Sequence, residues 1–115
     1  GFVQGMGWLT TEELLWDEAG RVISNSPANY KIPTAYDVPE KFSVELYDEA
    51  NREETVYQSK AVGEPPLMLA LSVWCALRDA AASFAEYKFS PPMNAPATPE
   101  EVFKAINSAK GYSSK

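Results

Sequence analysis

The sequence predicts an α+β fold, in which two short antiparallel hairpins pack around a central apolar helix and a C-terminal helix follows. Three observations lead to this prediction: alternating apolar and polar residues in the first half, an uncharged apolar run that begins at Leu67, and a capped helix start at Thr98. The chain has 115 residues, of which 45% are hydrophobic and 12% aromatic, and this composition suits one folded domain over residues 1–115.

The two hairpins are expected before the apolar run. The first is centred on a turn at residues 17–20, which separates the apolar residues 14–16 from 21–23. The second pairs residues 42–47, where apolar and polar side chains alternate, with residues 55–58. Each hairpin would expose one face and bury the other.

The central helix is predicted over residues 67–87, which are rich in Leu, Met and Ala and contain no proline. Its first turns are apolar on every side, a pattern that predicts a helix packed all round. Cys75 lies in this run and is interpreted as a buried small hydrophobe.

The C-terminal helix has the clearest start signal. Thr98 is the expected N-cap, Pro99 occupies the first helical position, and Glu101 is placed to close a capping box. The helix is expected to run to Lys110, because Gly111 is a typical helix terminator.

Composition excludes several classes of function. The formal net charge is −6, and no cluster of Lys or Arg forms a surface for nucleic acid or an anionic membrane. The uncharged apolar run, residues 67–77, is shorter than the ~20 residues of a membrane-spanning helix, so a soluble, cytoplasmic protein is expected. The chain contains no histidine, which excludes Ser-His-Asp and Cys-His catalysis and histidine metal ligands within it.

Two sets of residues are interpreted without a functional role. The adjacent glutamates at 12–13, 53–54 and 100–101 are interpreted as solvated surface charge, because neighbours in sequence do not face each other on a helix or strand. Gly1, Gly5 and Gly7 match neither a dinucleotide nor a phosphate-loop pattern. They predict only a close approach of the backbone to another group.

Gln4 and Glu64 leave two interpretations open. If Gln4 is buried among its apolar neighbours, its amide needs either a structural partner or a polar cofactor. Glu64 stands between Gly63 and Pro65, and the proline favours an extended backbone at Glu64. Its carboxylate is either a helix-terminal acid, stabilised by roughly 0.3–1 kcal/mol, or a functional group.

Five segments, in order along the chain, resemble the end of the molybdenum-binding subunit in the xanthine dehydrogenase family. They are GFVQGMG at 1–7, TEEL at 11–14, YKIP at 30–33, SKAVGEPPL at 59–67 and APATP at 95–99. The resemblance implies an incomplete, C-terminal piece of a larger molybdopterin-binding domain. Residues 1–88 would form its active-site part, and residues 89–115 a proline-rich arm and the terminal helix.

The resemblance also implies a chemistry. Glu64 would be the general base that activates a molybdenum-bound hydroxyl, and Gln4 and Gly63 would lie at the cofactor. The reaction would oxidise xanthine or hypoxanthine to uric acid. Two alternatives stay open: an aldehyde oxidase-type molybdenum hydroxylase, and a non-catalytic interaction domain in which Glu64 is only a helix-start acid.

Cofactors and partners follow from the same resemblance. Molybdopterin with its molybdenum would be shared with an upstream part of the subunit, and FAD and [2Fe–2S] clusters would lie on other domains or subunits. The implied partners are the remainder of the molybdenum subunit, an iron–sulfur/FAD subunit and a purine substrate, with neither nucleic acid nor membrane. The chain alone is expected to bind no cofactor and to be inactive.

Overall fold

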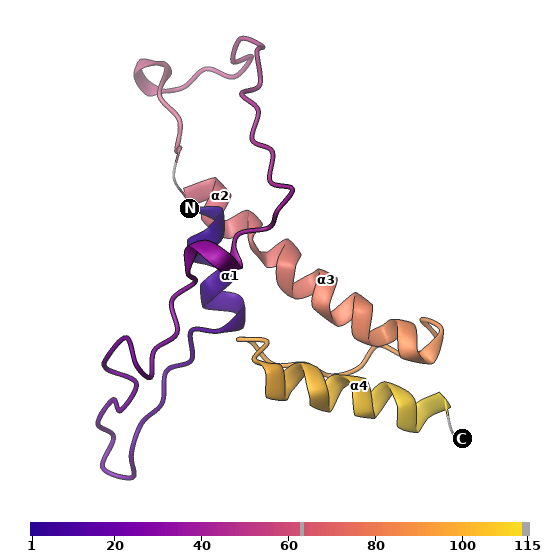
Figure 1. The fold of residues 1–115 in the computed structure, drawn as a ribbon. Helices are drawn as coiled ribbons and strands as arrows, with labels where there is room; N and C mark the ends of the chain where they lie inside the picture. Colours follow the sequence, from indigo (N-terminus) through magenta and orange to yellow (C-terminus); the bar gives the residue numbers. More distant parts are fainter. Residues whose placement is uncertain (63, 114–115) are drawn as a thin grey trace.

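The computed structural model describes residues 1–62 and 64–113 (Figure 1). In chain order its elements are α1 (Phe2–Thr10), η1 (Ala35–Asp37), η2 (Val56–Gln58), α2 (Glu64–Leu69), α3 (Leu71–Ala82), η3 (Ser83–Ala85) and α4 (Pro99–Ser113). The described residues therefore form a helical fragment, and the α+β prediction is wrong.

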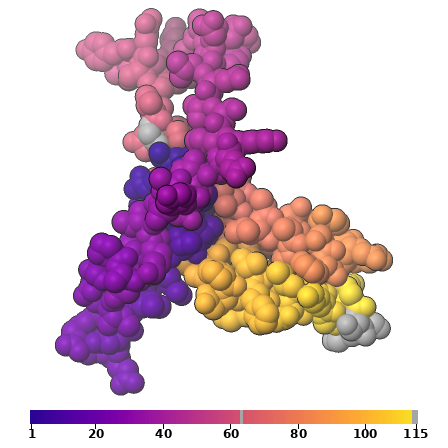
Figure 2. All heavy atoms as spheres, in the orientation of Figure 1, coloured from indigo at the N-terminus to yellow at the C-terminus, as the bar shows by residue number. Residues whose placement is uncertain are grey.

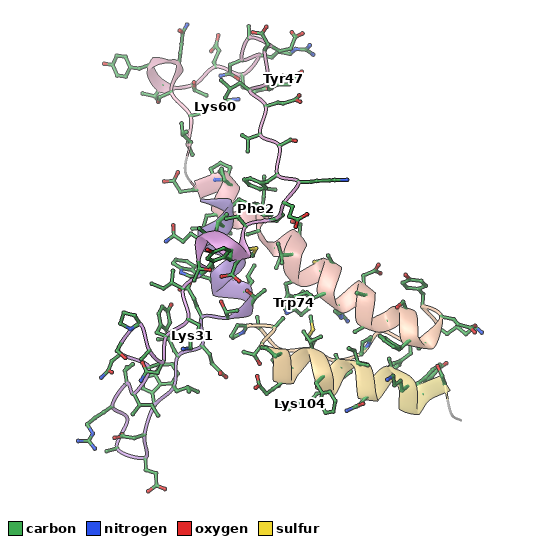
Figure 3. The ribbon with its side chains drawn as sticks, viewed as in Figure 1. Phe2, Lys31, Tyr47, Lys60, Trp74 and Lys104 are labelled. Carbon is green, nitrogen blue, oxygen red and sulfur yellow. The ribbon has the colours of Figure 1, made fainter. Side chains whose placement is uncertain are left out.

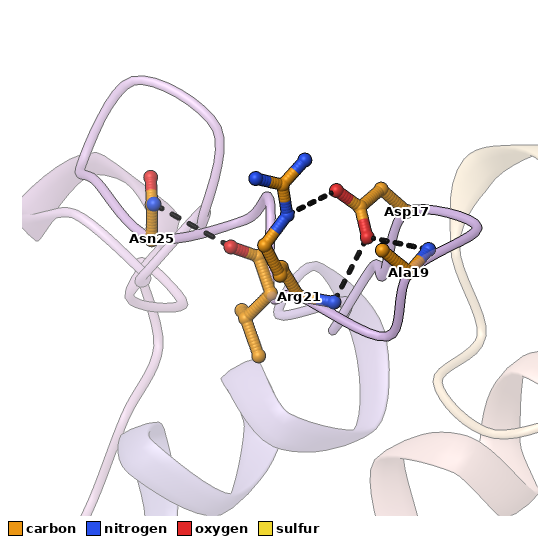
Figure 4. Close-up of polar contacts among 5 residues, drawn as sticks. Asp17, Ala19, Arg21 and Asn25 are labelled. Carbon is orange, nitrogen blue, oxygen red and sulfur yellow. Dashed lines mark hydrogen bonds and ion pairs between the residues drawn. The ribbon is translucent and has the colours of Figure 1, made fainter.

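The first expected hairpin is reduced to a turn. Trp16 and Val22 form one isolated antiparallel bridge, with no strand on either side. The turn itself is well made: Asp17 Oδ1 accepts hydrogen bonds from the backbone N–H groups of Ala19 and Arg21, and Arg21 Nε donates to Asp17 Oδ2 over 2.8 Å (Figure 4). The bond from the backbone of Arg21 is the main reason why the pKa of Asp17 lies below its usual value. The polar groups of the turn are thus hydrogen-bonded within the turn itself, without a ladder of hydrogen bonds between two strands.

The second expected hairpin does not form at all in the described residues. Residues 42–47 have no regular structure, and residues 56–58 form the 3₁₀ turn η2. Leu46 is 95% exposed, so the alternating pattern has no face to cover. Two strands alone are marginally stable in water, and nothing in the described chain packs on this pair.

The apolar helix begins earlier than expected and is interrupted. It starts at Glu64 and not at Leu67, because prolines are well tolerated in a first helical turn. Ala70 separates α2 from α3 and is fully buried, whereas Met68 is 73% exposed. Cys75 is also exposed. The expectations of a helix packed all round and of a buried cysteine are therefore wrong.

α4 begins at Pro99, as its start signal predicts. The backbone N–H of Glu101 donates to Thr98 Oγ1 over 3.3 Å, which confirms the N-cap. The reciprocal half of the capping box is replaced, because the Glu101 carboxylate accepts from the backbone N–H of Asn94 and from Lys104. The helix continues past Gly111 to Ser113, whose hydroxyl donates to the carbonyl of Phe84 on η3.

The proline-rich arm returns along α3, so that α3 and α4 run side by side in the same direction (Figure 1). Two α3 side chains one helical turn apart hold the arm: Trp74 Nε1 donates to the carbonyl of Asn94, and Arg78 Nε to that of Pro91. Figure 3 shows Trp74 in the space between α3 and the arm. The arm in turn joins α1, because Ala97 N–H donates to Leu9 C=O over 2.7 Å.

Three branches of the chain meet near α1 and give the molecule an open shape (Figure 2). The radius of gyration is 18.2 Å, against about 13 Å for a compact domain of this length. The buried hydrophobic side chains are alanines, which belong to α2–α4 and the arm: Ala70, Ala81, Ala82, Ala85, Ala97, Ala105 and Ala109. Large apolar side chains of the described chain are thus left on its surface.

One stretch of the described chain is long and apolar enough to cross a membrane by length and composition alone. It runs over Glu64–Ala85, with a mean hydropathy of 1.4 in its most apolar window. It is longer than the uncharged run 67–77 because it includes the charged Glu64, Arg78 and Asp79. A helix from the core of a larger protein has the same composition.

Candidate functional site

Gln4 and Glu64 lie on two helices that pack against each other. Gln4 is on α1 and Glu64 is the first residue of α2, and both side chains are exposed. Neither side chain has a hydrogen bond to the described part of the chain. The buried amide considered for Gln4 is therefore not found, and Gly63 lies outside the described residues.

Gly5 is the point at which α1 touches α2. A Cβ atom built on Gly5 would lie 2.4 Å from the carbonyl oxygen of Leu67 and 2.7 Å from Cβ of Ala70. Only glycine permits this approach, although a glycine inside a helix costs about 1 kcal/mol relative to alanine. The contact lies one residue from Gln4 and one helical turn from Glu64.

Gly7 makes a second close approach, toward the segment that follows α1. A Cβ on Gly7 would lie 2.3 Å from Oε1 of Glu12 and 2.4 Å from Cδ of Pro33. The close backbone approach predicted for the N-terminal glycines is thus confirmed at Gly5 and at Gly7. Each glycine fixes α1 against a different part of the chain.

Glu12 is the polar residue that the sequence interpretation missed. It is only 8% exposed, so its assignment to solvated surface charge is wrong. Its carboxylate accepts a hydrogen bond from the Tyr30 hydroxyl, and this bond is the main reason why the pKa of Tyr30 lies above its usual value. The available signal was the pairing of Gly7 with an acid five residues later, which leaves room for the carboxylate.

A groove of about 690 Å³ opens beside this cluster. Its lining combines aromatic and acidic side chains with the arm: Trp8, Glu12, Glu13, Leu14, Trp16, Tyr30, Ala95 and Pro96. Neither Gln4 nor Glu64 belongs to it. The two residues implied by the resemblance thus lie on two helices that are in contact, and neither lines this groove.

The hydrogen-bonding groups of Gln4 and Glu64 suit a polar cofactor that another part of the protein would hold against this chain. The Gln4 amide offers two donors and one acceptor, and an ionised Glu64 offers only acceptors. Both groups are exposed and have no partner in the described chain, so they are available to a ligand. Within residues 1–62 and 64–113, no three His, Cys, Asp or Glu side chains gather as a metal site would require.

Comparisons with known proteins give the family context. Residues 1–39 match the model of the molybdopterin cofactor-binding domain. The chain is 42% identical to the chicken xanthine dehydrogenase/oxidase over 90% of its length, and 44% identical to mouse aldehyde oxidase 2 over 88%. It is also 49% identical to maize indole-3-acetaldehyde oxidase over 69% of its length.

The chain spans only 8% of the length of the chicken and mouse relatives and 6% of the maize relative. The matches reach across both halves of the chain, whereas the domain model covers its first third. Together they confirm the family that the ordered sequence segments indicate. The chain therefore belongs to the xanthine dehydrogenase-like family, and its first 39 residues to the molybdopterin cofactor-binding domain of that family.

Proposed function

We propose that this chain supplies a general base, Glu64, and a cofactor contact, Gln4, to a molybdenum hydroxylase that oxidises xanthine or hypoxanthine to uric acid. The remainder of the molybdenum subunit would complete the site. FAD and [2Fe–2S] clusters on other domains or subunits would carry the electrons away.

One observation supports this proposal above the others. The Gly5 contact brings the helix that carries Gln4 onto the helix that carries Glu64, and leaves both polar side chains exposed. Exposed polar groups of this kind are free to exchange water for a ligand, because their hydrogen-bonding capacity is not used within the described chain. An amide donor and a carboxylate on adjoining helices suit a site that another part of the protein closes.

A bound molybdenum–pterin group would supply the oxidant and the oxygen for hydroxylation. Gln4 would orient this group by donating hydrogen bonds from its side-chain amide. Glu64 would accept a proton at a carboxylate oxygen, which is the task of a general base and typically contributes 10²–10⁴-fold to the rate. Gly63, whose structure lies outside the described residues, is proposed to let the backbone approach the cofactor.

The test is Glu64→Gln in the complete enzyme, which keeps the shape of the side chain and removes the base. We expect kcat to fall by about 10²–10⁴-fold while the molybdenum content per subunit is retained. Glu100→Gln is the matched control, because Glu100 is also an exposed acid in the first turn of a helix. Near-normal turnover of Glu64→Gln would instead support the interaction domain, in which this acid only stabilises a helix terminus.

An aldehyde oxidase-type hydroxylase is the second candidate function. It is supported by the 44% identity to mouse aldehyde oxidase 2 and by the 49% identity to maize indole-3-acetaldehyde oxidase over 69% of this chain. Glu64 would have the same role in either enzyme. Turnover of the complete enzyme with xanthine, hypoxanthine and a series of aldehydes separates the two candidates, because preference for one substrate class excludes the other.

A further inference from the structure

We propose that the contact of Gly5 with Leu67 and Ala70 positions Glu64 relative to Gln4, so that Gly5 and Ala70 are positioning residues for the reaction. The inference rests on the proposed function, because it concerns the placement of the proposed base. Neither residue would touch substrate or cofactor.

The first support is the tightness of the contact. The carbonyl oxygen of Leu67 and the methyl group of Ala70 both lie where a side chain on Gly5 would begin. Ala70 is fully buried there, although its neighbours Leu69 and Leu71 are 66% and 53% exposed. A fully buried methyl between two exposed leucines places the contact with Gly5 at the end of α2, where α3 begins.

The second support is the packing of α2. The helix has six residues, of which Glu64, Pro65, Met68 and Leu69 are exposed. In the described chain, α1 is the main element that packs on it. Because α2 is short and α1 packs both on it and on α3, the contact at Gly5 bears directly on where the first residue of α2 lies.

The size of the effect follows from the distances. An ordinary contact of a Cβ atom is 3.4–4 Å, so Gly5→Ala, with its Cβ at 2.4 Å from Leu67 O, must move the two helices apart by about 1 Å. The neighbour is a backbone carbonyl, which cannot rotate away as a side chain can. A displacement of this size near the reacting groups can lower the rate by about 10²-fold.

The experiment compares glycine substitutions in the complete, molybdenum-loaded enzyme. We expect Gly5→Ala to lower kcat per molybdenum by about 10²-fold. KM should change little, because substrate-binding groups elsewhere are untouched. A crystal structure of the variant should show Glu64 displaced relative to Gln4 by about 1 Å, a readout independent of turnover. Adding Ala70→Gly to Gly5→Ala should restore part of kcat, because it removes one of the two obstructing groups.

Two control substitutions separate positioning from general damage. Gly7→Ala crowds the same helix, but against Glu12 and Pro33 and not against α2. Gly111→Ala adds a methyl group where no atom lies within 4 Å. Gly111→Ala should keep kcat per molybdenum near that of the parent enzyme. Gly7→Ala should lower it less than Gly5→Ala does, because the groups that it meets are side chains of Glu12 and Pro33 and not the backbone of α2. A normal kcat in Gly5→Ala, or an equal loss in Gly7→Ala, would overturn the proposal.

Each of the remaining outcomes supports or opposes the positioning role. If Gly5→Ala yields no loaded enzyme, Ala70→Ser adds one atom to the same contact from the side of α2. A lowered kcat with unchanged KM then supports positioning, and a normal kcat opposes it. If Glu64→Gln retains turnover, the proposed base itself is wrong. If Glu64→Gln is inactive while Gly5→Ala is normal, only the positioning inference fails.

Discussion

The exposed apolar surface predicts that the chain, excised and produced alone as residues 1–115, does not form a compact native monomer. A compact domain of this length has a radius of gyration of about 13 Å and an unfolded chain about 35 Å, whereas the described structure has 18.2 Å. Its buried hydrophobic side chains are alanines, each of which contributes little free energy on burial. Backbone ordering alone costs about 1–2 kcal/mol per residue, so this core is too small to hold the open fold.

The assay is small-angle scattering together with thermal unfolding of the excised chain. We expect a radius of gyration well above 13 Å, binding of a hydrophobic dye, and no cooperative transition. The complete enzyme should bind far less dye, because the other parts of the subunit would cover the apolar side chains. A compact excised chain with a single cooperative transition would refute the reasoning, since the alanine core would then be sufficient.

Two further predictions concern single contacts in the complete enzyme. Thr98→Ala removes the acceptor for the N–H of Glu101 and should destabilise the first turn of α4 by about 1 kcal/mol, seen as roughly fivefold faster hydrogen exchange there; unchanged exchange would show that the cap does not hold the turn. The Tyr30 phenol donates to Glu12, so its raised pKa makes the stabilisation fully present below pH ~10 and lost as pH rises through the raised value. In a titration followed by tyrosinate absorbance, Tyr30→Phe should therefore remove one tyrosine that ionises later than the usual pH ~10. If the tyrosine that is lost ionises at the usual pH, the hydrogen bond between Tyr30 and Glu12 is contradicted.

The sequence predicts those parts of the fold that are determined within a few residues. The start of α4 needs only Thr98 and Pro99, and the turn at Asp17 closes with hydrogen bonds to residues two and four positions away. The hairpins fail for the opposite reason. The alternation at residues 42–47 indicates a strand with one face that prefers burial. In the described residues no other element covers that face, and Leu46 is exposed to solvent.

The candidate site shows the same difference between features determined within a few residues and features that depend on distant parts of the chain. The glycines at 5 and 7 correctly predict close approaches, because a missing side chain inside an apolar helix is costly unless something occupies the space. The groups that occupy the space beside each glycine could not be predicted from the neighbouring sequence. Leu67 is more than sixty positions from Gly5, and the partner of Glu12 is Tyr30, which belongs to a separate segment.

The comparisons limit which part of the reaction this chain can determine. The chain is almost equally identical to a xanthine dehydrogenase/oxidase and to an aldehyde oxidase, at 42% and 44%. A segment that selected between a purine and an aldehyde would be expected to resemble one of them more. The features proposed to matter here, a proton acceptor, an amide donor and the contact that places one helix on the other, are also those that either substrate would need. Under the proposed function, selection of the substrate is thus expected from residues outside this chain, and the contribution proposed for the chain itself is the chemistry common to both substrates.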